Sequence, residues 1–262
     1  MPHAYTVTIT NTSDFTHFAG NASAYHGATV LLEADLDLSA MYAPVEGFFG
    51  TLDGQGHTVK NLKSIGKDGD SALFNNLAEG VAIKNIVLDR SCVFNTSSNS
   101  GDTFIGGLIG TCTAKEGRCA VLNSVTMATV AFSGVFKDKN DGDRTIYMGG
   151  IIGQYTTRNY ECLVRNAVNY GDVVFNGDGH TIFVGGIVGS YEKGRAGAYL
   201  QNVLNYGSIV FAGTAFEEVN AGGVLGSGKS IAAEWCVNAG LIRISEKNSY
   251  YAGSLFRYAE SV

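Results

Sequence analysis

"NYGDVVFNGDGHTIFVGGIVGSY" spans Asn169–Tyr191, and a near copy, "NYGSIVFAGTAFEEVNAGGVLGS", spans Asn205–Ser227. The two stretches start 36 residues apart and share a glycine doublet, while the residues before it vary. Related doublets recur along the chain at intervals of 43, 36, 37 and 30 residues. They begin at Gly106, Gly149, Gly185 and Gly222, with a degenerate "AGSLF" at Ala252. A repeat of about 20 to 50 residues predicts a solenoid, a propeller or an array.

An asparagine column follows the doublets in a fixed register. It lies 13 residues beyond the last glycine of each of the first three motifs, and it extends one unit upstream. Its members are Asn85, Asn123, Asn166 and Asn202. Stacked coils would place these residues about 4.8 Å apart, and asparagine tolerates left-handed backbone and forms turn hydrogen bonds. We therefore predict an asparagine ladder at one turn of each coil.

Two apolar columns accompany the asparagines at the spacing of a β-strand. The first lies nine residues after each asparagine and comprises Phe94, Phe132, Phe175 and Phe211, with Ile244 in the last unit. The second lies two residues earlier and comprises Cys92, Val130, Val173, Ile209 and Ile242. We predict that both columns face the interior. The doublet glycines are expected to allow positive φ and close backbone approach.

The unit length favours a β-helix over a propeller. A propeller blade needs four strands and carries its own signature, whereas three short strands per coil fit 36 residues with room for loops. The sequence therefore predicts an all-β fold, a single parallel β-helix or β-solenoid. Residues 1–30 are expected to form a capping strand and a short helix that Ser13 opens as N-cap. Residues 31–262 form coils that continue from this cap as one domain.

The C-terminal stretch, "SEKNSYYAGSLFRYAESV", shows no comparable cap. A terminal coil carries unpaired strand edges, and such edges accept strands from another chain or from a further repeat. We therefore expect assembly through the C-terminal coil.

Composition narrows the class of partner. The 262 residues include 18 basic and 24 acidic side chains, a formal net charge of -6, and no basic block, so nucleic acid is not expected. With 45% hydrophobic residues the chain can bury a core. No stretch approaches the roughly 18 apolar residues of a membrane span. The start, "MPHAYTVTIT", lacks the regions of a signal peptide, and we favour a mature or excised segment over a cytosolic protein.

Five cysteines without a CxxC spacing predict neither a disulfide framework nor a zinc site. Cys119 and Cys162 each precede a column asparagine by four residues, so they are equivalent on adjacent coils. A Cys119–Cys162 bridge, a Cys112–Cys119 bridge and free thiols all remain open, because small shifts decide disulfide geometry. Cys92 is expected to be buried.

An acidic insertion makes the 43-residue unit longer than its successor. Aligned with a neighbouring turn, it gives the candidate Ca²⁺ ligands Asp138, Asn140, Asp141, Asp143 and Asp178. Glycine at the fifth place and a missing distal glutamate exclude an EF-hand. A solvated edge of turns explains the same residues. A weak Ca²⁺ site is thus one of two interpretations, and no other cofactor is expected.

Paired carboxylates would mark a glycoside-cleaving β-helix, in which two carboxyl groups lie about 5 to 9.5 Å apart. Asp35 and Asp37 alternate on one predicted strand face, and Asp53 follows with His57. These residues lie where Asp-Gly and Gly-His steps mark turns, and no cluster of arginine or lysine accompanies them. We therefore expect no catalytic residues.

Tyrosines also repeat with the units. Tyr170 and Tyr206 stand in "NYG", and other aromatic residues lie beside the glycine motifs. These others are Tyr147, Tyr155, Phe183 and Tyr191. Exposed tyrosines that stack on adjacent coils can bind sugar rings, whereas buried ones cover the flank of the solenoid. Both interpretations stay open, with Tyr170 and Tyr206 as the candidates for binding.

One long segment resembles a known family. "LLEADLDLSAMYAPVEGFFGTLDGQGHTVKNL" at Leu31–Leu62, "ALFNNLAEGVAIKNIVLDRSCVF" at Ala72–Phe94 and the "GGIVG" units are similar to the GLUG-motif repeat proteins. The resemblance covers roughly residues 5 to 256 and implies a right-handed parallel β-helix in a secreted or surface-displayed protein. That family includes adhesins and regions preceding some bacterial immunoglobulin-A-cleaving metallopeptidases. The HExxH motif is absent, so peptidase activity is not implied.

These observations predict a non-catalytic extracellular or cell-surface β-solenoid that acts as an adhesin, stalk or interaction module. Its ligand would be a protein or a glycan. Two alternatives stay open. A carbohydrate-active enzyme of the polysaccharide lyase or hydrolase type would need a carboxylate or cation cluster in one groove. A structural filament or virus-associated module would need a broad apolar outer face.

Overall fold

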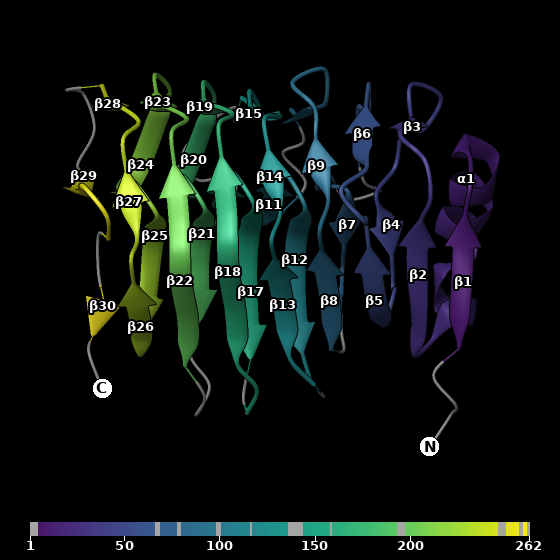
Figure 1. Cartoon of the computed structure of the whole chain (residues 1–262). Coiled ribbons are helices and arrows are strands. Elements are labelled where there is room, and N and C mark those ends of the chain that lie inside the picture. Colours follow the sequence, from purple (N-terminus) through teal and green to yellow (C-terminus); the bar gives the residue numbers. More distant parts are fainter. Residues whose placement is uncertain are drawn as a thin grey trace.

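The computed structural model describes residues 5–65, 69–77, 80–97, 101–115, 117–135, 144–157, 159–192, 197–245, 250–256 and 259–260. Within this part of the chain the strands form four sheets, and their paired strands run parallel. Successive coils lie side by side from one end of the molecule to the other (Figure 1). The fold is the parallel β-helix that the repeat predicts.

Sheet A is the largest sheet and has two rows of strands. Its first row comprises β1 (Thr6–Ile9), β2 (Ala28–Leu32), β5 (Gly50–Asp53), β8 (Val81–Lys84), β13 (Cys119–Leu122), β18 (Cys162–Asn169), β22 (Ala198–Asn205) and β26 (Ile231–Glu234). Its second row comprises β3 (Leu36–Asp37), β6 (Thr58–Lys60), β9 (Val87–Leu88), β14 (Val125–Thr126) and β27 (Val237–Asn238). β18 and β22 run through both rows and join them.

The other three sheets each take one strand from a coil. Sheet B comprises β4 (Val45–Glu46), β7 (Phe74–Asn75), β12 (Ile109–Ala114), β17 (Ile152–Thr157), β21 (Val188–Glu192), β25 (Leu225–Lys229) and β30 (Ala259–Glu260). Sheet C comprises β10 (Val93–Thr96), β15 (Thr129–Phe132), β19 (Val173–Phe175), β23 (Ile209–Phe211) and β28 (Ile242–Ile244). Sheet D comprises β11 (Thr103–Gly106), β16 (Thr145–Gly149), β20 (Asp178–Gly185), β24 (Thr214–Gly222) and β29 (Tyr250–Gly253).

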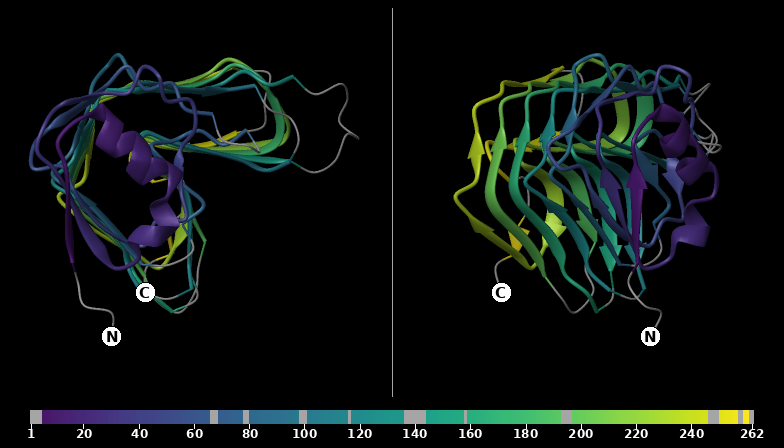
Figure 2. Two further views of the ribbon diagram at one scale, coloured as in Figure 1. Left: turned by 90° about the vertical axis from the view of Figure 1, so that its right-hand side faces the viewer. Right: turned by 45° about the vertical axis from the view of Figure 1, so that its right-hand side comes forward.

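A full coil therefore contains four strands, as in β18, β19, β20 and β21, and the expectation of three strands is wrong. The end-on view in Figure 2 shows the reason, because an arm projects from the closed body of the helix. Sheets A and B enclose the body, whereas sheets C and D are the two walls of the arm. The length of a coil is thus divided between a body and an arm.

The glycine doublets form the elbow where sheet D turns into sheet B. A Cβ atom on Gly185 would overlap the carbonyl oxygen of Val188, and one on Gly186 would overlap the carbonyl oxygen of Gly223 on the next coil. The same elbow position is held by Gly106, Gly149, Gly185 and Gly222. None of these four glycines has a positive φ, so that part of the expectation is wrong. Close backbone approach alone requires glycine here.

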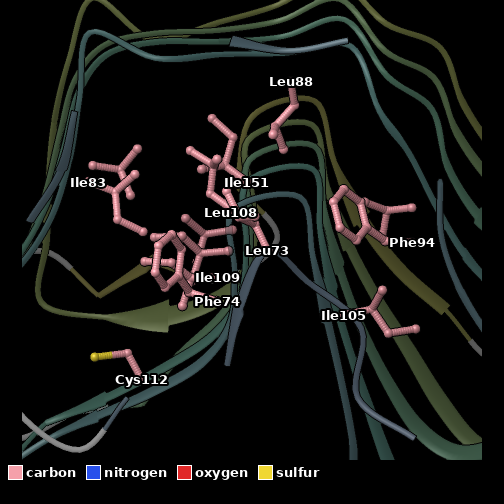
Figure 3. Close-up of a cluster of buried hydrophobic side chains, with 14 of the residues drawn as sticks. Leu73, Phe74, Ile83, Leu88, Phe94, Ile105, Leu108, Ile109, Cys112 and Ile151 are labelled. Atoms are coloured by element: carbon pink, nitrogen blue, oxygen red, sulfur yellow. The ribbon is translucent and has the colours of Figure 1, made fainter. Parts of the chain in front are cut away.

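Buried aliphatic and aromatic side chains fill both sides of the elbow. Figure 3 shows Leu108 and Ile151 beside the bend, with Phe74 on the body side and Ile105 on the arm side. All four side chains are fully buried. One continuous hydrophobic cluster runs from the capping helix through the coils. The elbow therefore joins the cores of the body and the arm.

The phenylalanine column is confirmed for three of its four members. Phe132, Phe175 and Phe211 stack inside the arm, with ring centroids 5.3 and 4.5 Å apart. Phe94 instead pairs with Val130, two residues out of register. The connection from β9 to β10 is two residues longer than the one from β14 to β15. Because a strand has a period of two, Phe94 still points into the core.

A second, buried ladder of polar side chains was not predicted. The Thr126 hydroxyl donates to Asn169 Oδ1 over 2.7 Å, and Asn169 Nδ2 donates to Asn205 Oδ1 over 2.9 Å. Asn205 Nδ2 donates in turn to Asn238 Oδ1 over 2.8 Å. Each of these amides also donates to the backbone carbonyl two residues further on. The ladder thus satisfies polar groups that would otherwise be costly to bury.

The N-terminal end is closed by a short helical cap. Helix α1 (Thr12–Gly20) packs Phe15 and Phe18 into the core, and the 3-10 helix η1 (Ala22–Tyr25) packs Ala22 there. The N-cap is Asn11, whose side chain accepts the N–H of Asp14 over 3.0 Å, so the expectation of Ser13 is wrong. Asn11 is placed three residues before the N–H that it caps, whereas Ser13 lies inside the first turn. No helix in the described ranges is long and apolar enough to cross a membrane.

The cysteines are free thiols in the structure, and Cys119 and Cys162 are strand partners as expected. Cys92, Cys112, Cys119 and Cys162 are buried, and Cys236 is partly exposed. Burial raises the pKa of Cys92 to about 11, and it also raises the pKa of Cys162 and Cys236. A thiol reacts as its thiolate, so high pKa and burial both slow reaction.

We expect a thiol-specific reagent at mildly alkaline pH to label the folded protein at Cys236 only, and slowly. The reagent should reach all five cysteines once guanidinium unfolds the chain without reductant. The measurement is the number of thiols labelled against time. A total of three thiols after unfolding would show that one of the two candidate disulfides had formed, and fast labelling of several thiols in the folded protein would contradict the burial.

Candidate functional site

The outer face of sheet A carries exposed side chains that repeat from coil to coil. β18 shows how the sequence produces this face. Val164 points into the core, Arg165 and Asn166 both point outward, and Ala167 returns to the core. Asn166 has a φ of 52°, and this single left-handed residue shifts the alternation. The face therefore continues from the first row of sheet A into the second row.

The predicted asparagine ladder runs along this shift. Its members Asn85, Asn123, Asn166 and Asn202 have φ values of 54°, 49°, 52° and 53°. Each Nδ2 donates to the Oδ1 of the preceding asparagine, over 3.0, 2.9 and 3.0 Å in turn. Asp53 takes the first place and accepts the Asn85 amide over 2.8 Å. The ladder is confirmed, and it holds the corner of each coil in the same conformation.

Trp235 follows the ladder on the last coil. The pairing of Gln201 with Glu234 places it directly beyond Asn202. Trp235 keeps the left-handed conformation, with a φ of 55°, and its side chain is 82% exposed. A bulky residue with positive φ is uncommon. The indole therefore adds non-polar surface at the C-terminal border of this face.

Non-polar columns lie on both sides of the ladder. The column toward sheet C comprises Val87, Val125, Val168, Leu204 and Val237. The column on the opposite side comprises Ala82, Ala120, Leu163, Tyr199 and Ala232. Tyr199 is 42% exposed and Val237 is 46% exposed. Aligned non-polar side chains on a regular sheet make a surface on which an extended ligand can lie.

The structure separates the repeated tyrosines into exposed and buried pairs. Tyr170 and Tyr206 are 53% and 46% exposed, and they stack with centroids 5.0 Å apart at 8°. Tyr155 and Tyr191 also stack, but they lie in the core. Tyr147 is nearly buried. Tyr170 and Tyr206 are therefore the repeated pair that a ligand can reach.

Three depressions mark this face and its border with sheet C. One, of about 390 Å³, lies around Tyr199, and a second, of about 440 Å³, lies between Tyr170 and Arg90. The third, of about 570 Å³, lies beside the first part of the ladder at Asn85. Small-ligand sites have volumes of about 300 to 1,000 Å³. Each of the three depressions is thus in the size range of a small-ligand site.

The candidate catalytic carboxylates serve turns and ion pairs. Asp35 accepts the backbone N–H of Thr58 and the Lys60 ammonium, and the first of these bonds contributes most to lowering the pKa of Asp35. The backbone N–H of Ser39 lowers the pKa of Asp37. For Asp53, burial opposes ionisation, but hydrogen bonds from Asn85 and Lys84 outweigh it and the pKa is lowered. All three groups are carboxylates at neutral pH, so none is suited to be a general acid.

The candidate Ca²⁺ ligands form no metal-binding cluster in the described part of the chain. Asp138, Asn140, Asp141 and Asp143 lie outside the described residues. Asp178 begins β20 and is partly exposed. Among the described residues, no group of three or more His, Cys, Asp and Glu side chains is placed to hold a metal ion. The Ca²⁺ interpretation therefore stays a prediction.

No protein-family model matches the chain, and a search of curated proteins found no match. A solved structure from Bacteroides ovatus, described as a "putative immunoglobulin A1 protease", is similar in fold, with a TM-score of 0.54. The two sequences are 16% identical, and the match covers 97% of this chain and 84% of that one. A likeness at this identity shows the fold and leaves activity open.

Proposed function

We propose that this chain is a non-catalytic β-solenoid of the GLUG-motif type, extracellular or displayed on a cell surface, which acts as an adhesin, stalk or interaction module. The observation that carries the proposal is the outer face of sheet A. On this face and at its border with sheet C, aromatic and aliphatic side chains repeat at the spacing of the coils, about 4.8 Å. Such a face suits an extended protein or glycan ligand, because successive coils place non-polar groups at equivalent positions.

The carboxylates support a binding role over an enzymatic one. A glycoside hydrolase needs one carboxyl group whose pKa is raised. Asp35, Asp37 and Asp53 instead have lowered pKa values and fixed hydrogen-bond partners. A carbohydrate-active enzyme is the alternative, and it would need a different set of groups.

Assembly through the C-terminal coil is part of the proposal. Ile242 and Ile244 are only partly buried, whereas their partners Ile209 and Phe211 on the preceding coil are buried. A depression of about 630 Å³ opens between β28 and β29 at this end. An uncovered strand edge beside non-polar side chains is suited to strand addition. Light scattering of the purified protein reports this association.

The proposal is tested by incubating the purified protein with immobilised polysaccharides and mucin-type glycoproteins, with calcium or with EDTA. Bound protein and released reducing or unsaturated ends are scored in the same samples. We expect retention without product. Released ends that disappear in Asp53→Asn would contradict the non-catalytic assignment. Retention that EDTA abolishes would favour the Ca²⁺ interpretation of the acidic edge.

A further inference from the structure

The exposed tyrosine stack is unfinished on one side. Backbone hydrogen bonds place Met127, Tyr170 and Tyr206 at the same position on three adjacent coils, because Tyr170 N donates to Thr126 O and Tyr206 N to Asn169 O. Tyr206 covers one face of the Tyr170 ring at 5.0 Å. The other face points along the helix axis toward Met127, which has no ring. One layer of the stack is therefore missing above Met127.

That missing layer coincides with the 440 Å³ depression. Its lining consists of Arg90, Met127, Thr129, Tyr170 and Asp172. Adjacent coils are about 4.8 Å apart, close to the 5.0 Å between the two tyrosine rings. The layer thus has the thickness of a single ring. A flat ligand placed there would continue the order Tyr206, Tyr170, ligand.

The polar groups that line the depression can form further hydrogen bonds. Asp172 uses Oδ1 to accept the N–H of Ser208 over 2.8 Å, and no hydrogen bond within the described residues occupies its Oδ2. Within the described part of the chain, the Arg90 guanidinium makes no ion pair and the Tyr170 hydroxyl makes no side-chain hydrogen bond. The depression therefore combines an aromatic face, a cation, an anion and hydroxyl groups.

This combination selects the class of ligand. A pyranose ring has C–H groups on its face and hydroxyl groups on its rim that both donate and accept hydrogen bonds. Its face can stack on Tyr170, while its rim meets Asp172 and Arg90. An aromatic side chain could stack on Tyr170, but its ring has no hydroxyl groups to exchange hydrogen bonds with these charged groups. The charges of Arg90 and Asp172 cancel, so the site favours neither an anionic nor a cationic ring.

The geometry points to a subsite for one neutral hexopyranose, stacked on the free face of Tyr170 above Met127 and bound through Asp172 and Arg90. This inference rests on the proposed binding function and names a ligand class and a place for it. The sugar would belong to a neutral polysaccharide or to the glycan of a glycoprotein.

The test compares four proteins. Met127→Tyr fills the layer with the residue that the next two coils already carry, so the fold is retained while the subsite is blocked. Tyr170→Ala removes the stacking face. Tyr42→Ala is the matched control, because Tyr42 is an exposed tyrosine in the connection between β3 and β4, outside the proposed binding face. Saturation-transfer NMR with the methyl glycosides of glucose, galactose and mannose measures binding to each protein.

We expect Met127→Tyr to abolish the transfer and Tyr170→Ala to weaken binding about tenfold or more, while Tyr42→Ala binds like the wild type. Retention on a neutral polysaccharide, and on mucin before and after deglycosylation, shows which source supplies the sugar. If Met127→Tyr binds glycosides like the wild type, the subsite is wrong although the protein is still a glycan binder. If the wild type binds no neutral sugar but stays on deglycosylated mucin, the ligand class is wrong and the interaction module stands.

Discussion

Gly186→Ala should lower the free energy of unfolding by about 3 kcal/mol or more. The added Cβ would overlap the carbonyl oxygen of Gly223 and the side chain of Asn205. The carbonyl belongs to the next coil, and the amide is fixed in the buried ladder, so neither group can move without breaking hydrogen bonds. Chemical denaturation followed by circular dichroism measures the change.

Gly20→Ala is the matched control. Gly20 ends helix α1, and a Cβ atom there would meet nothing within 4 Å. Alanine favours helix over glycine by up to about 1 kcal/mol, so this variant should be unchanged or slightly more stable. Equal losses in Gly186→Ala and Gly20→Ala would show that the elbow does not require close approach.

Asn205→Ala should lower the free energy of unfolding by about 3 kcal/mol. Asn205 is 1% exposed, and it is bonded to Asn169, to Asn238 and to the carbonyl of Gly207. Alanine would leave these buried partners short of hydrogen bonds and would create a cavity. The same denaturation experiment measures the loss.

The exposed ladder provides the comparison for that variant. Asn202→Gly removes one hydrogen bond, to Asn166, and glycine adopts a φ of 53° without strain. Water can replace the lost bond, so the expected change is under about 1 kcal/mol. If Asn205→Ala and Asn202→Gly lose the same free energy of unfolding, burial is not the reason why Asn205 is important.

Where the offset from the glycine doublets is constant, the sequence predicted the structure residue by residue. Asn123, Asn166 and Asn202 occupy equivalent places, and so do Phe175 and Phe211. The prediction failed at Phe94, because the turn before β10 is two residues longer on that coil. A loop insertion changes register without changing which residue types are apolar, so a column read from sequence cannot detect it.

The arm and the buried ladder were beyond sequence reasoning for different reasons. The number of residues in a coil sets the perimeter of its cross-section. A triangular cross-section and a body with an arm can have the same perimeter. The buried ladder did leave a signal, since Asn169, Asn205 and Asn238 each lie three residues after a left-handed corner. Asparagine is also common in turns, so this spacing alone does not distinguish a buried ladder from a turn.

The candidate site was predicted only in part. Tyr170 and Tyr155 both repeat on the next coil, yet one is exposed and the other is buried. The exposure of a side chain depends on the alternation of inward and outward positions along its strand. Each glycine elbow and each left-handed residue shifts this alternation by one position. The proposed subsite above Met127 exists because this position has no aromatic ring, unlike the next two coils. It can be recognised only once the stacking of the coils is known.

Asn166 and Asn202 occupy the same corner of neighbouring coils, 36 residues apart. Recombination between two such corners removes or duplicates a coil without creating a new kind of contact. Each event changes the length of the molecule by one step of about 4.8 Å. Proteins built on this plan can therefore vary in reach by whole steps, while the core of every remaining coil is inherited intact.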